Sequence, residues 1–164
     1  MKYKVYTDGS CVTSSKLGGY GVVVLDEKET IVFVEHEAYS NTTNNRMELR
    51  AFLVALEYVT SHCQEGDEIE CFTDSAYISN CFAQNWYKTW QANGWRTSNR
   101  LKVKNVDLWK PIIKNFNQTK IQSIIFNIEK VKSHSGIKWN EYVDDIANSW
   151  RGLDDEKDFI VDQD

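Results

Sequence analysis

The sequence predicts one α/β domain built on a mixed β-sheet, and three observations lead to this prediction. The chain has 164 residues, which is the size of a single domain with its own hydrophobic core. Short apolar runs rich in β-branched residues alternate with longer segments whose apolar residues recur at helical spacing. Their order, three strands and a helix followed by further strands and helices, is typical of one mixed sheet with helices packed on it.

The first three strands are expected near the N-terminus. Residues 2–7 alternate between apolar and polar side chains and lead into Asp8-Gly9-Ser10, a turn signal that should end the strand. Residues 22–25 and 31–34 are apolar and mostly β-branched, and a short polar turn separates them. We therefore expect these two segments to pair as a hairpin.

Helices and strands should alternate in the rest of the chain. The polar residues 40–45 offer several N-caps, and Leu49, Leu53 and Leu56 share one face of the helix that follows. The later elements are expected in this order: a strand at 68–73, a helix from 74, a helix at 109–115 that includes Pro111, a strand at 124–131 and a helix at 140–150.

The end of the chain differs in composition from the rest. Residues 154–164 contain six acidic residues and one lysine. We therefore predict a folded domain over residues 1–153 and a flexible acidic tail over residues 154–164.

Membrane insertion, disulfides and zinc are not indicated. No apolar run approaches the roughly 20 residues that span a bilayer, and the first residues lead directly into a strand pattern. The four cysteines form no C-x-x-C pair, which favours reduced thiols: Cys11, Cys63, Cys71 and Cys81. We expect a cytoplasmic protein.

The charge distribution permits a polyanionic partner although the formal net charge is −5. Residues 77–106 contain five basic residues and no acid, and they also contain Trp86, Trp90 and Trp95. Surface charges are screened over roughly 8 Å at physiological salt, so this patch can act independently of distant acids. Two interpretations stay open: a basic surface that binds nucleic acid, or a small subdomain whose tryptophans pack together.

Four acidic residues stand where predicted strands end or predicted helices begin: Asp8, Glu48, Asp74 and Asp144. Taken singly, each is explained as a turn former or as an acid at a helix start. Taken together, they indicate a site, because the strand ends of an α/β sheet are where sites are usually assembled. Converging carboxylates require cations, and oxygen ligands select hard ions such as Mg²⁺ or Mn²⁺.

Local motifs then resemble those of type 1 ribonuclease H, in the order of that family, over about residues 3–150. They are YTDGSC at 6–11, GGYG at 18–21, TTNNRMEL at 42–49, TDSAY at 73–77, GW at 94–95, KNVDLW at 104–109, VKSHSG at 131–136 and NEYVDDIA at 140–147. The resemblance implies a ribonuclease H-like fold, with a five-stranded mixed sheet, three strands of it antiparallel, and helices packed on both sides.

The resemblance also implies a catalytic site. Asp8, Glu48, Asp74 and Asp144 match the family's metal-binding carboxylates, with Asp144 rather than Asp145 in the motif position. Two Mg²⁺ ions, or Mn²⁺ as a substitute, would bind there together with the substrate. His134 matches a loop histidine that assists proton transfer or product departure.

Further residues match the family's substrate contacts. Cys11, Asn44 and Asn45 correspond to positions that line the RNA side, although both asparagines are also candidate helix caps. Thr43 and Asn105 correspond to a pocket for a DNA phosphate. The family's basic protrusion, which holds the DNA strand, corresponds to a segment that includes Trp86, Arg96, Arg100, Lys102 and Lys104.

The expected function is endonucleolytic hydrolysis of the RNA strand of RNA–DNA hybrids, leaving 5′-phosphate and 3′-hydroxyl ends. No membrane and no obligatory protein partner are expected, and the chain should be a monomer. Two alternatives stay open: another nuclease of the same fold, and a hybrid-binding module without catalysis. The presence of all four carboxylates argues against the second.

Overall fold

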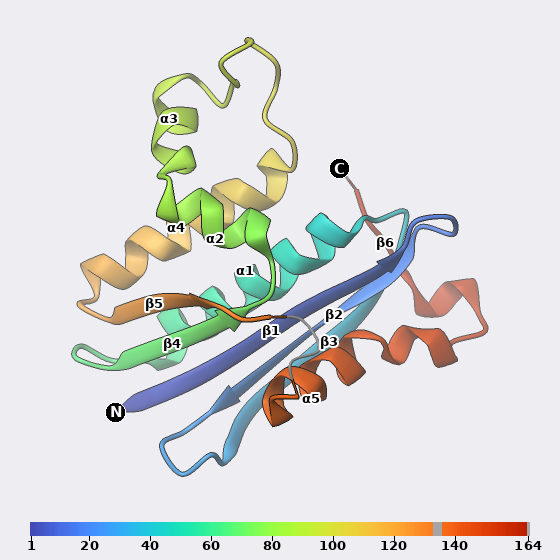
Figure 1. The fold of residues 1–164 in the computed structure, drawn as a ribbon, viewed down its shortest axis with the longest axis horizontal. Helices are drawn as coiled ribbons and strands as arrows, with labels where there is room; N and C mark the ends of the chain where they lie inside the picture. Colours follow the sequence, from blue (N-terminus) through green and yellow to red (C-terminus); the bar gives the residue numbers. More distant parts are fainter. Residues whose placement is uncertain (133–135, 164) are drawn as a thin grey trace.

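The computed structural model describes residues 1–132 and 136–163, and a six-stranded sheet forms its centre (Figure 1). The strands are β1 (Lys2–Val12), β2 (Leu17–Leu25), β3 (Ile31–Ser40), β4 (Glu68–Thr73), β5 (Ile125–Lys130) and β6 (Ile160–Val161). Their order across the sheet is β5-β4-β1-β2-β3-β6. The first three strands pair antiparallel, while β4, β5 and β6 join the sheet in parallel.

Helices cover both faces of this sheet, as the sequence predicts (Figure 1). They are α1 (Asn44–His62), α2 (Ala76–Ala83), α3 (Trp86–Ala92), α4 (Val106–Ile121) and α5 (Lys138–Ala147). Because neighbouring residues of a strand point to opposite faces, Val22 and Val24 pack in the main core with α1 and α4, whereas Val23 packs under α5. Within the described residues, no helix has both the length and the apolar character that crossing a membrane requires.

Strand β1 is longer than predicted. The expected turn at Asp8-Gly9-Ser10 is wrong, because the strand continues to Val12. The extension is held by the glycine-rich start of β2, which pairs Asp8 with Gly21 and Cys11 with Gly18. Asp8 therefore lies inside a strand and is paired with β2.

The predicted five strands become six because the end of the chain adds one. A flexible tail is expected from residue 154, whereas in the structure Ile160 pairs with Tyr39 and Val161 with Ser40. Asp162, the residue that follows this short strand in the sequence, is only 1% exposed. The apolar run at residues 159–161 is too short to predict a strand by itself, and the ion pairs of Asp162 with Arg46 and Arg50 link distant parts of the sequence.

The tryptophans of residues 77–106, here called the basic segment, pack against one another. The Trp90 ring lies 6.1 Å from that of Trp95, 6.2 Å from that of Trp86 and 5.4 Å from that of Trp109. For Trp90 and Trp95, the structure therefore supports the interpretation that these tryptophans pack together in a small subdomain. The basic residues around them remain available at the surface of the segment that rises above the sheet in Figure 1.

Candidate active site

Asp8 is placed by an unusually close approach of β1 to α1. A Cβ atom at Gly9 would lie 2.4 Å from the backbone nitrogen of Glu48 and 2.9 Å from the Cβ of Met47. Only glycine allows the two elements to come this near. Asp8, which precedes Gly9, and Glu48, whose backbone Gly9 contacts, are thereby brought into the same site.

Glu48 lies in the second turn of α1, whose start is fixed by a cap. The Thr43 hydroxyl accepts a hydrogen bond from the backbone N–H of Arg46 at 3.2 Å. The Glu48 side chain is almost fully buried, and its Oε2 atom has no hydrogen-bond partner among residues 1–132 and 136–163. A buried carboxylate oxygen without a partner is costly unless a cation binds it.

Asp74 follows the last residue of β4 and precedes Ser75, the N-cap of α2. Strand β4 runs parallel to β1, with Phe72 opposite Tyr6, so both strands deliver their carboxylates to the same part of the sheet. Ligand atoms of Asp8, Glu48 and Asp74 all lie within 4.8 Å of one another.

Asp144 reaches the same hollow from α5. This helix packs tightly on β2, where a Cβ atom at Gly21 would lie 2.9 Å from the carbonyl oxygen of Val143. The Asp144 carboxylate is held by Asn148, whose Nδ2 donates to Oδ1 at 3.2 Å. The Ser10 hydroxyl in turn donates to Asn148 Oδ1 at 2.6 Å. All four carboxylates line one hollow, here called the carboxylate hollow.

The electrostatics of the carboxylate hollow oppose full ionisation. Burial, the charge of Asp74 and a hydrogen bond with Asp144 raise the pKa of Asp8 to about 8. Burial and the charges of Asp8 and Asp74 raise the pKa of Glu48 well above its usual value. Ionised carboxylates this close together require positive charge between them.

The donor set fits hard divalent cations. The three clustered acids offer only oxygen ligands, and oxygen atoms are what Mg²⁺, Mn²⁺ and Ca²⁺ prefer. Glu48 Oε2, which has no hydrogen-bond partner in the described part of the chain, points to the same conclusion. The geometry therefore agrees with the metal site that the sequence predicts.

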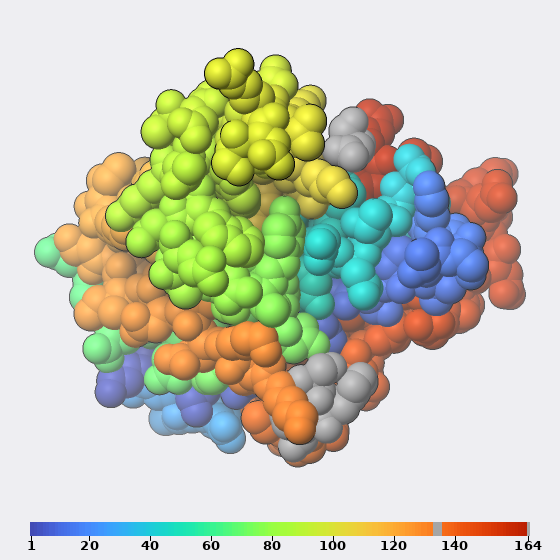
Figure 2. All heavy atoms as spheres, turned by 45° about the horizontal axis from the view of Figure 1, so that its top comes forward, coloured from blue at the N-terminus to red at the C-terminus, as the bar shows by residue number. Residues whose placement is uncertain are grey.

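A second hollow opens beside the first, at the start of α1, here called the amide hollow. It is lined by Thr43, Asn44, Asn45, Lys102, Lys104 and Asn105, together with neighbouring residues of α1 and α4. Asn44 lines both hollows, and Cys11 lines the carboxylate hollow. Figure 2 shows this face, with the yellow-green basic segment standing beside the cyan start of α1.

The rest of the basic segment is more spread out. Trp86 and Arg96 line a separate shallow hollow with Trp90. Arg100 is exposed and contacts neither main hollow; its carbonyl oxygen accepts a long hydrogen bond from Arg96 at 3.5 Å. His134 lies outside the described residues.

Four residues of the carboxylate hollow were not predicted as site residues: Gly9 and Ser10, which lie within the YTDGSC motif, and Asn148 and Arg151, which lie outside every quoted motif. Asn148 is the C-cap of α5 and follows Asp144 by four residues, a spacing that places the two side chains on the same side of the helix, so the sequence carried a usable signal. Arg151 lies beyond α5 in a short 3₁₀-helix, which helical spacing does not predict.

Comparisons with known proteins agree with this geometry. A family model described as RNase H matches residues 1–151. The chain is 40% identical over 149 residues to a ribonuclease H of Acetivibrio thermocellus, covering 89% of this chain and 92% of the relative.

Solved structures are also similar. A type 1 RNase H with the type 2 active-site motif has a TM-score of 0.72 and 26% identity, covering 99% of this chain and 77% of its own. The foamy viral protease-reverse transcriptase in complex with RNA/DNA hybrid has a TM-score of 0.72 and 21% identity, covering 88% of this chain and 19% of its own. The second likeness shows the fold alone.

Proposed function

The chain belongs to the RNase H family, and we propose that it is an endonuclease that hydrolyses the RNA strand of RNA–DNA hybrids. The observation that carries this proposal is the cluster of Asp8, Glu48 and Asp74 within 4.8 Å, in a chain that matches the family over residues 1–151. The cleavage products would carry 5′-phosphate and 3′-hydroxyl ends.

The proposed cofactor is a pair of Mg²⁺ ions, for which Mn²⁺ can substitute. Asp8, Glu48, Asp74 and Asp144 would hold them. When bound, the ions supply a Lewis acid that activates water and stabilises charge on the phosphate. The protein itself must keep its carboxylates in place. The hydrogen bonds from Ser10 to Asn148 and from Asn148 to Asp144 help to hold one of them.

His134 is proposed to move a proton during product formation or departure, since an imidazole titrates near neutral pH. It corresponds to the family's loop histidine by sequence alone. Its contribution should be smaller than that of the carboxylates.

Substrate recognition is proposed to divide between the two hollows. Cys11, Asn44 and Asn45 would face the RNA strand, because amides both donate to and accept from 2′-hydroxyls. Thr43 and Asn105 would bind a phosphate of the DNA strand. The basic segment would contact the DNA backbone through a set of five residues: Trp86, Arg96, Arg100, Lys102 and Lys104.

The working form is proposed to be a cytoplasmic monomer without an obligatory protein partner. The four cysteines are free thiols, which suits a reducing compartment.

The direct test is to present four duplexes of one sequence with Mg²⁺: the hybrid with label on RNA, the hybrid with label on DNA, duplex RNA and duplex DNA. We expect cleavage of the RNA strand of the hybrid only. Cutting of duplex DNA at a comparable rate would favour another nuclease of this fold. Tight hybrid binding with no cleavage would favour a non-catalytic binding module.

A further inference from the structure

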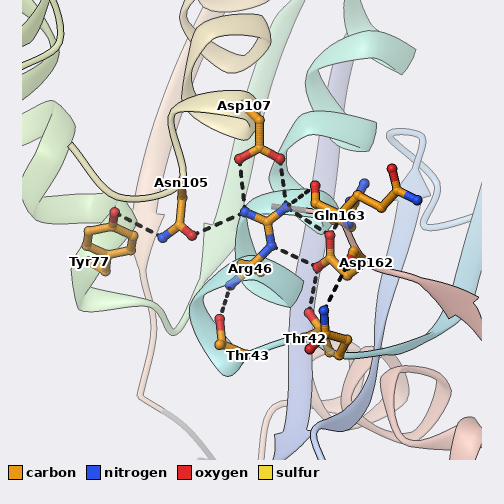
Figure 3. A network of polar contacts seen from close by, with 10 residues as sticks. Thr42, Thr43, Arg46, Tyr77, Asn105, Asp107, Asp162 and Gln163 are labelled. Atoms are coloured by element: carbon orange, nitrogen blue, oxygen red, sulfur yellow. Dashed lines mark hydrogen bonds and ion pairs between the residues drawn. The ribbon is translucent and has the colours of Figure 1, made fainter. Parts of the chain in front are cut away.

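The acidic end of the chain is tied to the start of α1 by one buried carboxylate. Asp162 Oδ2 accepts from the Thr42 hydroxyl at 2.7 Å and from Arg46 Nε at 2.8 Å. Asp162 Oδ1 accepts from Arg46 Nη2 at 2.8 Å and from Arg50 Nη2 at 2.6 Å. Strand β6 adds backbone bonds, including one from the Asp162 N–H to the Ser40 carbonyl at 2.9 Å. Figure 3 shows the central part of this network.

Arg46 also connects the C-terminal segment to the start of α4. Its Nη1 donates to Asp107 Oδ1 at 2.9 Å and to Asn105 Oδ1 at 3.3 Å, and its Nη2 donates to Asp107 Oδ2 at 2.7 Å. Together with the bonds to Asp162, these contacts occupy all five N–H groups of the guanidinium. Arg46 is also only 2% exposed, so it is a link between elements and not a free cation for a substrate.

The link fixes the orientation of the side-chain amide of Asn105, a residue that lines the amide hollow. A guanidinium has donors and no acceptor, so Asn105 must present its oxygen to Arg46. The amide nitrogen is left on the opposite side, where one of its N–H groups donates to the Tyr77 hydroxyl at 3.5 Å and the second N–H remains for a ligand. An amide that offers N–H groups is the correct orientation for an anion, since phosphate oxygens only accept hydrogen bonds.

We propose that Asp162 is a positioning residue for binding of the DNA strand: through Arg46, the C-terminal strand β6 and Asp162 hold the Asn105 amide in the orientation that keeps an N–H donor available to a phosphate. This inference rests on the proposed function, which assigns a DNA phosphate to the amide hollow. Residues 160–162 would then contribute to substrate binding although Asp162 lines neither the carboxylate hollow nor the amide hollow.

The proposal can be separated from a simple effect of charge. Asp162→Asn removes a negative charge near the amide hollow, and by electrostatics alone this change would strengthen binding of a polyanion. The positioning role predicts weaker binding, because Arg46 would be less firmly held and would no longer fix the orientation of the Asn105 amide. The two explanations therefore predict opposite changes in hybrid affinity.

The experiment measures KM and kcat on a short RNA–DNA hybrid with Mg²⁺, well below the melting temperature of each variant. For Asp162→Asn we expect KM to rise about fivefold to tenfold with kcat nearly unchanged, as for loss of a hydrogen bond to a charged group. The matched control is Asp158→Asn, which removes one charge from an exposed tail residue, and its KM should stay at the wild-type value.

A double-mutant cycle distinguishes positioning from general loosening. In an Asn105→Ala background, Asp162→Asn should change KM by less than about twofold, because the group that it positions is already gone. An unchanged or lower KM for Asp162→Asn, or the same rise in both backgrounds, would overturn the proposal. If Asp162→Asn fails to fold, Thr42→Val, which removes one of the bonds to the carboxylate, takes its place in the cycle. Failure of the proposed function would be visible separately, as absence of hybrid cleavage by the unmodified chain.

Discussion

At the scale of single residues, Asp74 offers the cleanest separation of chemistry from folding. Asp74→Asn keeps the side-chain shape and removes one charge from the carboxylate cluster. We expect kcat to fall by at least about a hundredfold, because a neutral amide holds a divalent ion poorly. Hybrid binding should be retained, and the metal-free protein should become more stable, since repulsion within the cluster decreases. Single-turnover cleavage and thermal unfolding in chelator measure both effects.

The adjacent pair of acids on α5 supplies the control for this experiment. Asp144 lines the carboxylate hollow, whereas Asp145 is exposed and does not. Asp145→Asn should therefore cleave at the wild-type rate, while Asp144→Asn should behave like Asp74→Asn. More than a tenth of wild-type kcat in Asp74→Asn would contradict the role proposed for that residue.

At the scale of elements, the basic segment should contribute binding and not chemistry. Replacing Arg96, Arg100, Lys102 and Lys104 by alanine should raise KM while kcat changes little. If half of these residues contact phosphate, the slope of log K against log salt should flatten by about two units. The measurement is hybrid affinity over a range of salt concentrations.

A matched variant controls for charge alone. Lys4, Lys28, Lys114 and Lys120 are exposed and line neither the carboxylate hollow nor the amide hollow. Their replacement by alanine removes the same charge and should leave the salt slope close to that of the unmodified chain. Equal slopes for the two quadruple variants would remove the basic segment from the binding surface.

The elements that the sequence predicts well are those with strong local patterns. Leu49 and Leu56 mark the buried face of α1, and the β-branched runs mark β2 and β3. The predicted turn at Asp8 fails because pairing with distant glycines of β2 outweighs a local turn signal. The carboxylates were predictable by resemblance and by their places near element ends, but the Gly9 contact that joins two of them depends on tertiary packing.

At the scale of the whole molecule, the buried Asp162 couples stability to pH. Burial opposes its ionisation, but hydrogen bonds from Arg46, Arg50 and Thr42 outweigh burial and lower the pKa of Asp162 to about 2. A carboxyl whose pKa is lower in the folded state stabilises that state above its unfolded pKa. The contribution, roughly 2 kcal/mol, should be present above about pH 4 and lost as the pH falls toward 2.

Urea unfolding from about pH 5 to pH 2 measures this loss, with Asp162→Asn as the comparison. The variant should be less stable near pH 5 and should lose less stability on acidification, so the two curves converge. Parallel curves would show that the Asp162 ion pairs contribute nothing to folding.

The central claim is that converging carboxylates support metal-dependent attack of water on the RNA strand, and analysis of the cleaved ends with and without chelator tests it most directly. With Mg²⁺, the fragments should carry 5′-phosphate and 3′-hydroxyl ends, and excess chelator should stop cleavage. Attack by the neighbouring 2′-hydroxyl would instead leave a cyclic phosphate and a 5′-hydroxyl. Cleavage that persists in chelator, or fragments with those ends, would contradict the account.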